Sequence, residues 1–226
     1  MPTSDFASDP HADRVPGTVR ERLRDVYWIG GGPGGGKSTI ARRLAEQFDL
    51  RLYVTDDMMQ DHARRLTADE APYLELFKAM DIDERWVNRT PEAMVETFHW
   101  FRGEGFAAVV EDLLARPAAT PAIVEGFRLL PRLVAPLLAE RSHAVYLAPT
   151  PEFREAALDS RGSAGLIADR TSDPERARRN MARRDAMFVD RLVAEAEQVG
   201  LPVVRQRVGV TEDEAYELVV RQFGLG

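Results

Sequence analysis

The sequence feature that most constrains the fold is a run of glycines that ends in a lysine and two hydroxyl residues. Residues 31–39 read Gly-Gly-Pro-Gly-Gly-Gly-Lys-Ser-Thr and match the pattern G-x-x-x-x-G-K-[ST] in full. A short apolar segment, 25–29, precedes the run, and Ile40, Leu44 and Phe48 then recur every four residues, as on one face of a helix. The sequence therefore predicts a strand, a tight glycine loop and a helix in immediate succession.

A loop of this composition can surround a polyphosphate. Glycines let backbone N–H groups turn toward an anion without Cβ clashes, and the helix N-terminus adds partial positive charge. Lys37, which with Lys78 makes up all the lysine of the chain, would reach the β- and γ-phosphates, and the Ser38 hydroxyl would ligate Mg²⁺. We therefore expect ATP and Mg²⁺ as cofactors. The residues expected to bind the nucleotide are Gly31, Gly32, Pro33, Gly34, Gly35, Gly36, Lys37, Ser38 and Thr39.

The rest of the chain alternates short strands with helices, which is typical of a parallel sheet covered on both faces. Strands are expected at 25–29, 50–54, 122–125, 144–147 and 201–205. Helices are expected at 38–48, 58–90, 91–116, 129–141, 174–199 and 212–223. Pro72 breaks the second of these helices, and Gly103 and Gly105 interrupt the third, which allows two helices there. Thr211 and Glu214 have capping-box spacing before the last helix.

Composition narrows the classes of function. A net charge of −7 disfavours a general nucleic-acid-binding surface. The absence of cysteine excludes disulfides, thiolate catalysis and Cys-based zinc sites, and it makes the cytoplasm the default compartment. No apolar run reaches the roughly 18 residues of a membrane span, so no membrane partner is expected. Residues 1–22 lack periodicity and are expected to be a flexible tail before a single domain, 23–226.

Carboxylates follow two of the predicted strands. Asp56 and Asp57 come directly after the second strand, and Glu125 ends the third. Because the carboxyl ends of parallel strands meet at the edge of the sheet where ligands bind, these side chains face one region. Either aspartate could accept the proton of an attacking hydroxyl, and Asp56 or Glu125 could help Ser38 to hold Mg²⁺. A helix N-cap with an acidic first turn would explain one of the two aspartates without any catalytic role.

The set GGPGGGKST, LYVTDDMM and AIVEG, followed by an Arg-rich segment, resembles the P-loop kinases of small molecules and nucleotides. This superfamily includes shikimate and gluconate kinases, nucleoside monophosphate kinases, uridine kinase-like enzymes and chloramphenicol phosphotransferase. The resemblance covers about residues 25–223 and implies the α/β P-loop NTPase fold, with a five-stranded parallel sheet of order 2-3-1-4-5 flanked by helices. The chain lacks the N-K-x-D motif of guanine-nucleotide switches.

The resemblance also assigns roles to residues. In such kinases the acidic residue after strand two binds the phosphoryl acceptor, and similarity to nucleoside monophosphate kinases favours Asp57, whereas similarity to chloramphenicol phosphotransferase favours Asp56. Residues 152–190 correspond to an Arg-rich lid, whose first part, up to residue 175, has no regular pattern. One or two lid arginines should contact phosphate, with Arg179 and Arg183 as first choices, although a solvated helix face would explain the same charge run. The other candidates are Arg170, Arg176, Arg178 and Arg184.

Residues 58–116 lie where these kinases insert their acceptor-binding helices. The segment is rich in aromatic residues, which could form a pocket for a ring-bearing acceptor, although core packing explains most of them. Arg128 could hold an anionic acceptor or lie at the surface, His99 lacks metal-ligand spacing, and Glu111 and Asp112 fit a solvated helix face. The ring-bearing residues are Tyr73, Phe77, Trp86, Phe98, His99, Trp100, Phe101 and Phe106.

Together these features predict a Mg²⁺-dependent kinase that transfers the γ-phosphoryl group of ATP to a hydroxyl or phosphate of a small molecule. The acceptor could be a metabolite, a nucleoside or nucleotide, or an antibiotic. Two alternatives stay open: a nucleotide-binding regulatory ATPase with little phosphotransfer, and a toxin-like or RNA-end kinase with a macromolecular acceptor. The sequence does not distinguish ATP from GTP, or a monomer from a homodimer.

Overall fold

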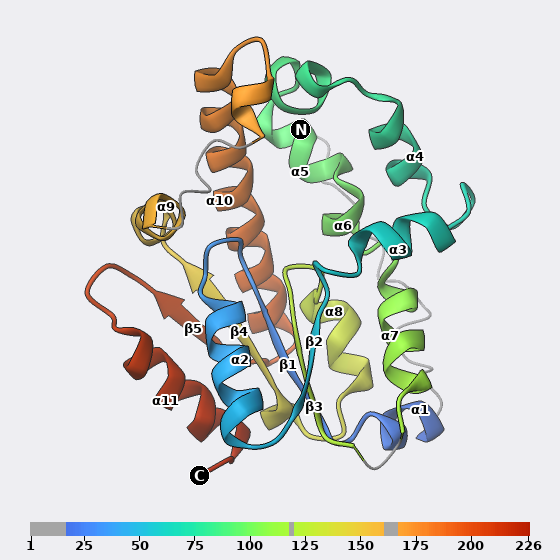
Figure 1. The fold of residues 1–226 in the computed structure, drawn as a ribbon, viewed down its shortest axis with the longest axis vertical. Helices are drawn as coiled ribbons and strands as arrows, with labels where there is room; N and C mark the ends of the chain where they lie inside the picture. The colour runs from blue at the N-terminus through green and yellow to red at the C-terminus, as the bar shows by residue number, and fades with distance from the viewer. Residues whose placement is uncertain (1–16, 118–119, 161–166) are drawn as a thin grey trace.

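The computed structural model describes residues 17–117, 120–160 and 167–226, which form an α/β structure around one five-stranded sheet (Figure 1). All neighbouring strands are parallel, and their order, β2-β3-β1-β4-β5, confirms the expected one. The strands are β1 (Val26–Gly31), β2 (Arg51–Val54), β3 (Ala122–Glu125), β4 (Ala144–Pro149) and β5 (Val203–Gln206).

Helices make all the connections between these strands. The α-helices are α1 (Gly17–Arg22), α2 (Lys37–Gln47), α3 (Met59–Arg65), α4 (Pro72–Ala79), α5 (Pro91–Thr97), α6 (His99–Arg102), α7 (Phe106–Ala115), α8 (Pro131–Val134), α9 (Pro151–Ser160), α10 (Pro174–Gln198) and α11 (Glu212–Phe223). The described residues also form a π-helix, η1 (Glu84–Asn88), and the short 3₁₀ segments η2 (Ala135–Leu137), η3 (Arg141–His143) and η4 (Ala168–Arg170). Of the described helices, none is both long and apolar enough to cross a bilayer.

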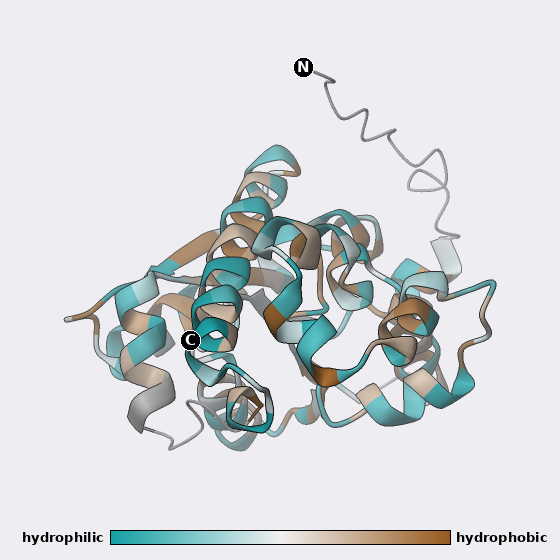
Figure 2. Ribbon diagram, turned by 90° about the horizontal axis from the view of Figure 1, so that it is seen from above, coloured by the Kyte–Doolittle hydropathy of each residue, from teal (hydrophilic) through white to brown (hydrophobic). Residues whose placement is uncertain are grey.

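The alternation of side chains along the strands divides the core into two halves. Trp28 and Val124 point to one face of the sheet, which α1, α7, α8 and α10 cover. Ile29 and Ile123, their neighbours in sequence, point to the other face, which α2 and α11 cover. In Figure 2 the hydrophobic segments accordingly lie inside a largely hydrophilic outer layer. Both faces are therefore buried, as the near-continuous apolar strands predict.

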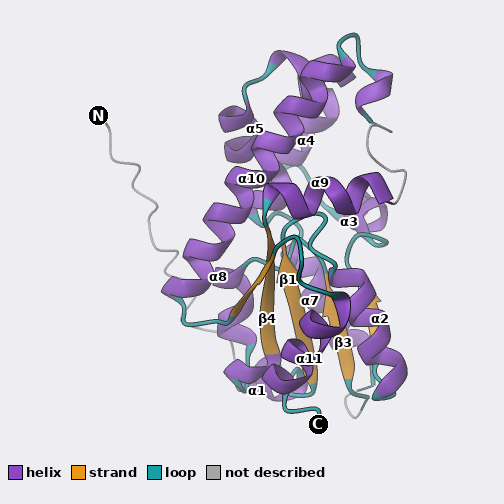
Figure 3. Cartoon of the chain, turned by 90° about the vertical axis from the view of Figure 1, so that its left-hand side faces the viewer, coloured by secondary structure: helices purple, strands orange, loops and turns teal. Residues whose placement is uncertain are grey.

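A helical region lies beyond the carboxyl ends of the strands. Helices α4 and α5 and the start of α10 stand past the end of the sheet, and α9 crosses beside them (Figure 3). Trp86 and Val87 of η1 pack there against Ala168 and Ala177, which binds the region to α10. Segments 58–116 and 167–190 thus meet at the edge of the sheet where the glycine-rich loop also lies (Figure 1).

The N-terminal boundary differs from the prediction. Residues 1–16 of the predicted tail lie outside the described residues, but Gly17–Arg22 form α1, so a tail reaching residue 22 is wrong. Arg20 donates from Nε and Nη2 to the Pro136 carbonyl at 3.2 and 2.9 Å, and Leu23 is fully buried. These partners lie more than a hundred residues away, so no local pattern indicated the helix.

Three other segments also differ from the expected helices. The predicted helix 91–116 is three helices, because Gly103 and Gly105 adopt left-handed φ values of 93° and 72° and Phe98 is extended. The predicted helix 129–141 contains only α8 and η2, whose prolines allow single turns. The stretch after β4 is not irregular: it contains α9, which begins at Pro151 and is capped by the Thr150 hydroxyl, 3.3 Å from the backbone N–H of Phe153.

The predicted capping box of the last helix is present and can be tested. The Thr211 hydroxyl accepts from the Glu214 N–H, and the Glu214 side chain accepts from the Thr211 N–H. We expect Thr211→Ala to lower the free energy of unfolding by ~1 kcal/mol, measured by urea denaturation, because one N–H loses its acceptor. Thr211→Ser keeps the hydroxyl and should stay within about 0.5 kcal/mol of the natural protein. An equal loss in both variants would contradict the capping interpretation.

Candidate functional site

The glycine-rich loop, residues 31–36, rises from β1 and turns directly into α2. Gly31 and Gly34 have φ values of 138° and 76°, a region that side chains rarely adopt. A Cβ on Gly31 would lie 2.2 Å from the Leu147 carbonyl oxygen, and one on Gly34 would lie 2.9 Å from Cγ of Arg154. The loop is therefore held closely between β4 and α9, in a shape that requires glycine.

The start of α2 places three polar groups at the mouth of this loop. No side chain caps the helix at its N-cap residue, Gly36, so the first-turn N–H groups point toward the loop. The Lys37 ammonium donates to the Gly32 carbonyl oxygen at 2.8 Å. The Ser38 hydroxyl donates to Oε1 of Glu125 at 2.7 Å. This arrangement of amides, ammonium and hydroxyl is suited to an anion and a hard cation together.

Glu125 joins the loop to the centre of the sheet. It ends β3 and lies in register with Ile29 of β1 and Val54 of β2. Its exposed fraction is only 2%, and this burial raises the pKa of its carboxyl, while Lys37 and the bond from Ser38 oppose the rise. Glu125 thus lies between the loop and the turn after β2.

Asp56 lies at the same edge, two residues past the end of β2. The Thr55 N–H donates to the Glu125 carbonyl oxygen at 2.9 Å, which fixes the chain just before Asp56. Asp56 reaches the surface on one side. Burial of its other sides raises the pKa of its carboxyl, and the charge of Lys37 is the main influence that opposes this rise. Asp57 is exposed, and its charge raises the Asp56 pKa further. The structure therefore brings Asp56, rather than Asp57, into the field of Lys37 and Glu125.

Ser38, Glu125 and Asp56 offer only oxygen atoms. Hard cations such as Mg²⁺ prefer such ligands, and Mg²⁺ commonly takes one or two carboxylates and completes its shell with water and phosphate oxygens. Among the described residues no group of three or more His, Asp and Glu side chains could hold a metal by itself. The donor set thus fits Mg²⁺ bound together with a phosphate, and does not fit a closed, all-protein metal site.

A buried network supports the turn that carries Asp56. Arg128 donates to the Thr55 carbonyl oxygen at 3.3 Å and to Nδ1 of His62 at 2.9 Å, which places the ring hydrogen of His62 on Nε2. That nitrogen donates to Oδ2 of Asp112 at 2.8 Å, and the Tyr53 hydroxyl donates to the same oxygen at 2.6 Å. The network ties β2, α3, α7 and the turn after β3 together.

Two expectations are corrected by this network. Arg128 is not a surface residue open to an anionic acceptor: it is 2% exposed, its guanidinium lies 4.0 Å from the centre of the Trp100 ring, and burial lowers its pKa to about 10. Asp112 does not belong to a solvated helix face, because Tyr53, His62 and Arg65 all donate to it and together hold its pKa low against burial. Arg128 bonds the backbone next to Asp56 directly, and Asp112 supports it through His62.

The predicted phosphate-binding arginines lie on the outer side of α10. Arg179 and Arg183 are 67% and 71% exposed and form ion pairs of 3.6 and 3.9 Å with Glu175 and Glu92. Arg170, Arg176 and Arg178 are also exposed, and Arg178 pairs with Asp169. The expected shared face of residues 176, 179 and 183 is therefore present, and it points to solvent.

The sequence analysis missed Arg154 and Asp185, which lie beside the glycine-rich loop. Arg154, on the first turn of α9, packs its stem against Gly34 and pairs with Asp185 of α10. Arg184 pairs with the same carboxylate and is buried, unlike the other arginines of its run. Thr150-Pro151 has the hydroxyl and proline pattern of a helix start and could have indicated α9, but no local pattern indicates that residues 154 and 185 meet.

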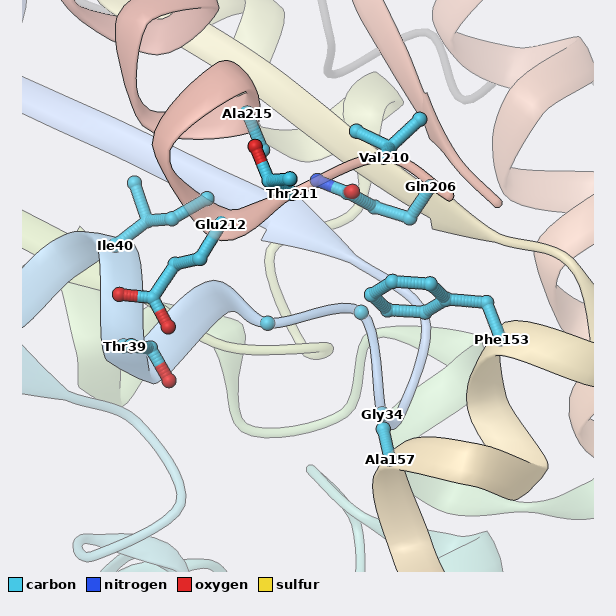
Figure 4. A pocket seen from close by; sticks show the side chains of 12 residues that line it. Gly34, Thr39, Ile40, Phe153, Ala157, Gln206, Val210, Thr211, Glu212 and Ala215 are labelled. Atoms are coloured by element: carbon cyan, nitrogen blue, oxygen red, sulfur yellow. The ribbon is translucent and has the colours of Figure 1, made fainter. Parts of the chain in front are cut away.

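A pocket opens on the other side of the loop, between α2, α9 and the segment that joins β5 to α11 (Figure 4). Thr39 and Glu212 line one end, and Phe153 and Gln206 line the other. Gln206 is almost fully buried, and no described residue forms a hydrogen bond with its side-chain amide. The pocket thus combines an aromatic ring with polar groups, next to the loop backbone.

The aromatic residues expected to surround an acceptor largely pack against one another. Trp86, His99, Trp100 and Phe101 are buried, and the Arg184 guanidinium lies 5.1 Å from the centre of the Trp86 ring. Burial, reinforced by nearby positive charges, lowers the pKa of His99 to about 3. Core packing therefore accounts for Trp86 and Phe101, and the ring of His99 packs edge-on against that of Trp100.

The neutral state of His99 makes stability depend on pH. Its folded pKa lies below the unfolded value, so the unfolded chain binds the proton first, and stability present above pH 6.5 is lost as the pH falls. From pH 7.5 to 5.5 this residue alone should cost about 1.4 kcal/mol of unfolding free energy. We expect His99→Phe to remove that part of the slope in urea titrations at both pH values. An unchanged slope would show that His99 is charged in the folded protein.

Comparisons with known proteins identify no family. No protein-family model matches the chain, and no curated protein matches it. Among solved structures, a crystal structure of an uncharacterized protein from Eubacterium ventriosum is similar, with a TM-score of 0.47 and 14% sequence identity. The similarity covers 89% of this chain and 98% of that one.

Proposed function

We propose that the protein is a Mg²⁺-dependent kinase with a P-loop NTPase fold, which transfers the γ-phosphoryl group of ATP to a hydroxyl or phosphate of a small molecule. The observation that carries the proposal is the hydrogen bond between Ser38 and the buried Glu125, formed beside Lys37 at the uncapped start of α2. The hydroxyl, the carboxylate and the ammonium lie there beside the backbone N–H groups of the first turn of α2, whose N-terminus no side chain caps. This is the arrangement that a metal–triphosphate complex requires.

The residues present would divide the binding of ATP between two places. The loop amides, the first turn of α2 and Lys37 would hold the phosphates, and the pocket lined by Phe153 and Gln206 would take the base. Ser38 and Glu125 would hold Mg²⁺, with Asp56 close enough to contribute through water. When bound, Mg²⁺ neutralises phosphate charge during transfer.

The reaction itself asks little covalent chemistry of the protein. The acceptor oxygen forms a bond to the γ-phosphorus, the bond from that phosphorus to the β–γ bridging oxygen breaks, and ADP leaves. Where the acceptor is a hydroxyl, its proton passes to the carboxylate of Asp56 or Asp57. Asp56 is favoured by the influence of Lys37, because this cation favours the ionised carboxylate and opposes the rise in pKa that burial causes.

Arg179 and Arg183 would have to turn toward the phosphates to act as lid residues. Their side chains are exposed, and exposed ion pairs of this kind contribute only about 0–1 kcal/mol, so little opposes such a movement. Their task would be to neutralise charge on the transferring group and to exclude water.

The two lysines provide a matched test. We expect Lys37→Ala to reduce ADP release by at least about 100-fold, because the phosphates lose their positioning charge. Lys78→Ala removes an exposed lysine paired with Glu75 and should retain full turnover. The measurement is the release of ADP from ATP, or of GDP from GTP, with Mg²⁺, screened against nucleosides, nucleotides, sugars and hydroxylated antibiotics.

The same screen, extended to RNA ends and cell-wall precursors and accompanied by a measurement of ATP binding, separates the alternatives. Tight ATP binding without any acceptor would favour a nucleotide-binding regulatory protein, and activity only with RNA ends or cell-wall precursors would favour a macromolecular acceptor. Normal turnover by Lys37→Ala would refute the kinase proposal.

The two aspartates can be distinguished by isosteric substitution. We expect Asp56→Asn to lower kcat roughly 100-fold or more, since a carboxamide cannot accept the acceptor's proton, with a small change in KM for ATP. Asp57→Asn, at the exposed neighbouring position, should cost about tenfold or less. The reverse order of the two kcat values would assign the role to Asp57.

A further inference from the structure

Asp185 accepts hydrogen bonds from two arginines that belong to different parts of the molecule. Its Oδ2 accepts from Nη2 of Arg154 in α9, and its Oδ1 accepts from Nε and Nη2 of Arg184 at 2.7 and 2.5 Å. The Asp185 side chain is 2% exposed. A carboxylate removed from water to this extent depends on such partners for its charge.

The cluster has more positive than negative charge. Two guanidinium groups share one carboxylate, and both arginine side chains are largely buried. Nε of Arg154 is itself buried and has no hydrogen-bond partner among the described residues. Because an uncompensated buried cation is costly, the cluster is complementary to an additional anion.

The glycine-rich loop lies directly beside this cluster. A Cβ on Gly34 would lie 2.9 Å from Cγ of Arg154, and a Cβ on Gly32 would lie 2.4 Å from Cγ2 of Val189. Val189 follows Asp185 by one helical turn in α10, so both residues face the loop. The Arg154 guanidinium is thus held between the loop and α10, at the place where the proposed function puts the phosphates.

We propose that Asp185 is a positioning residue, which fixes the Arg154 guanidinium so that it contacts the β- or γ-phosphate of a bound nucleotide. The inference rests on the proposed function. A free arginine side chain loses rotamer entropy when it is ordered, and an ion pair that already holds the fork in place removes much of that cost from binding. Arg154, and not the exposed arginines of α10, would then supply the first cation beside the loop.

The test measures which part of the nucleotide loses affinity. Isothermal titration gives Kd for ATP, ADP and adenosine with the natural protein, Arg154→Met, Asp185→Asn and the double variant. Methionine keeps the apolar stem against Gly34 and removes only the charge. We expect each single variant to weaken ATP binding by about tenfold or more and adenosine binding by less than about twofold, and the double variant to bind ATP no more weakly than Arg154→Met.

A control and two contrary outcomes complete the experiment. Asp169→Asn removes the acid of an exposed pair with Arg178 and should leave all three affinities unchanged. Equal losses for ATP and adenosine, or a double variant whose loss is the product of the single losses, would overturn the inference. If Asp185→Asn does not fold, Asp185→Glu replaces it, because the displaced carboxylate should cause the same ATP-specific loss. A natural protein that binds neither ATP nor ADP would instead refute the proposed function.

Discussion

The buried carboxylate of Glu125 is the point on which the rest of the candidate site depends. A charge in the middle of a sheet edge is unfavourable unless cations and donors surround it, and here Ser38 and Lys37 do so. Because both partners belong to the first turn of α2, their contacts with the carboxylate tie the start of that helix to the end of β3. The glycines of the loop between β1 and α2 permit the positive φ values that its tight turn requires. Register in the sheet, helix position and loop shape are thus coupled through one side chain.

Local sequence patterns predicted the parts of the fold that depend on local interactions. The strand β3, the helix α11 with its capping box and the strand–loop–helix around residues 31–36 agree with the structure because backbone preferences and short-range bonds specify them. The strand order came from the resemblance and not from any pattern. The helix α1 and the true extent of α8 depend on packing against residues far along the chain, and no periodicity in a short window could reveal them.

The residues of the candidate site also divide into those that local patterns predict and those that depend on contacts between distant parts of the chain. Sequence reasoning found Lys37, Ser38, Asp56 and Glu125, because each follows a predicted strand or opens a predicted helix, and the structure brings them together. It assigned Asp112 to solvent because periodicity alone cannot show that Tyr53 and His62 donate to it from 59 and 50 residues away. It selected arginines by their density in the sequence, whereas Arg154, which packs against the loop, is the single arginine of its helix. Charge pairing across α9 and α10 is a tertiary property.

The pocket beside the loop has a consequence for partial unfolding of the protein. Part of its wall comes from α2 and α11, the two helices that together cover one face of the sheet, and the rest comes from α9, the end of β5, the segment that follows it and the glycine-rich loop. Partial opening of that face, in which α11 leaves the sheet while the opposite face stays folded, would destroy the pocket. Any ligand bound there would therefore suppress this opening, by ~2.7 kcal/mol at a hundredfold excess over its Kd. Amide hydrogen exchange would slow along α11 while exchange along α7 and α8, on the opposite face, stayed the same.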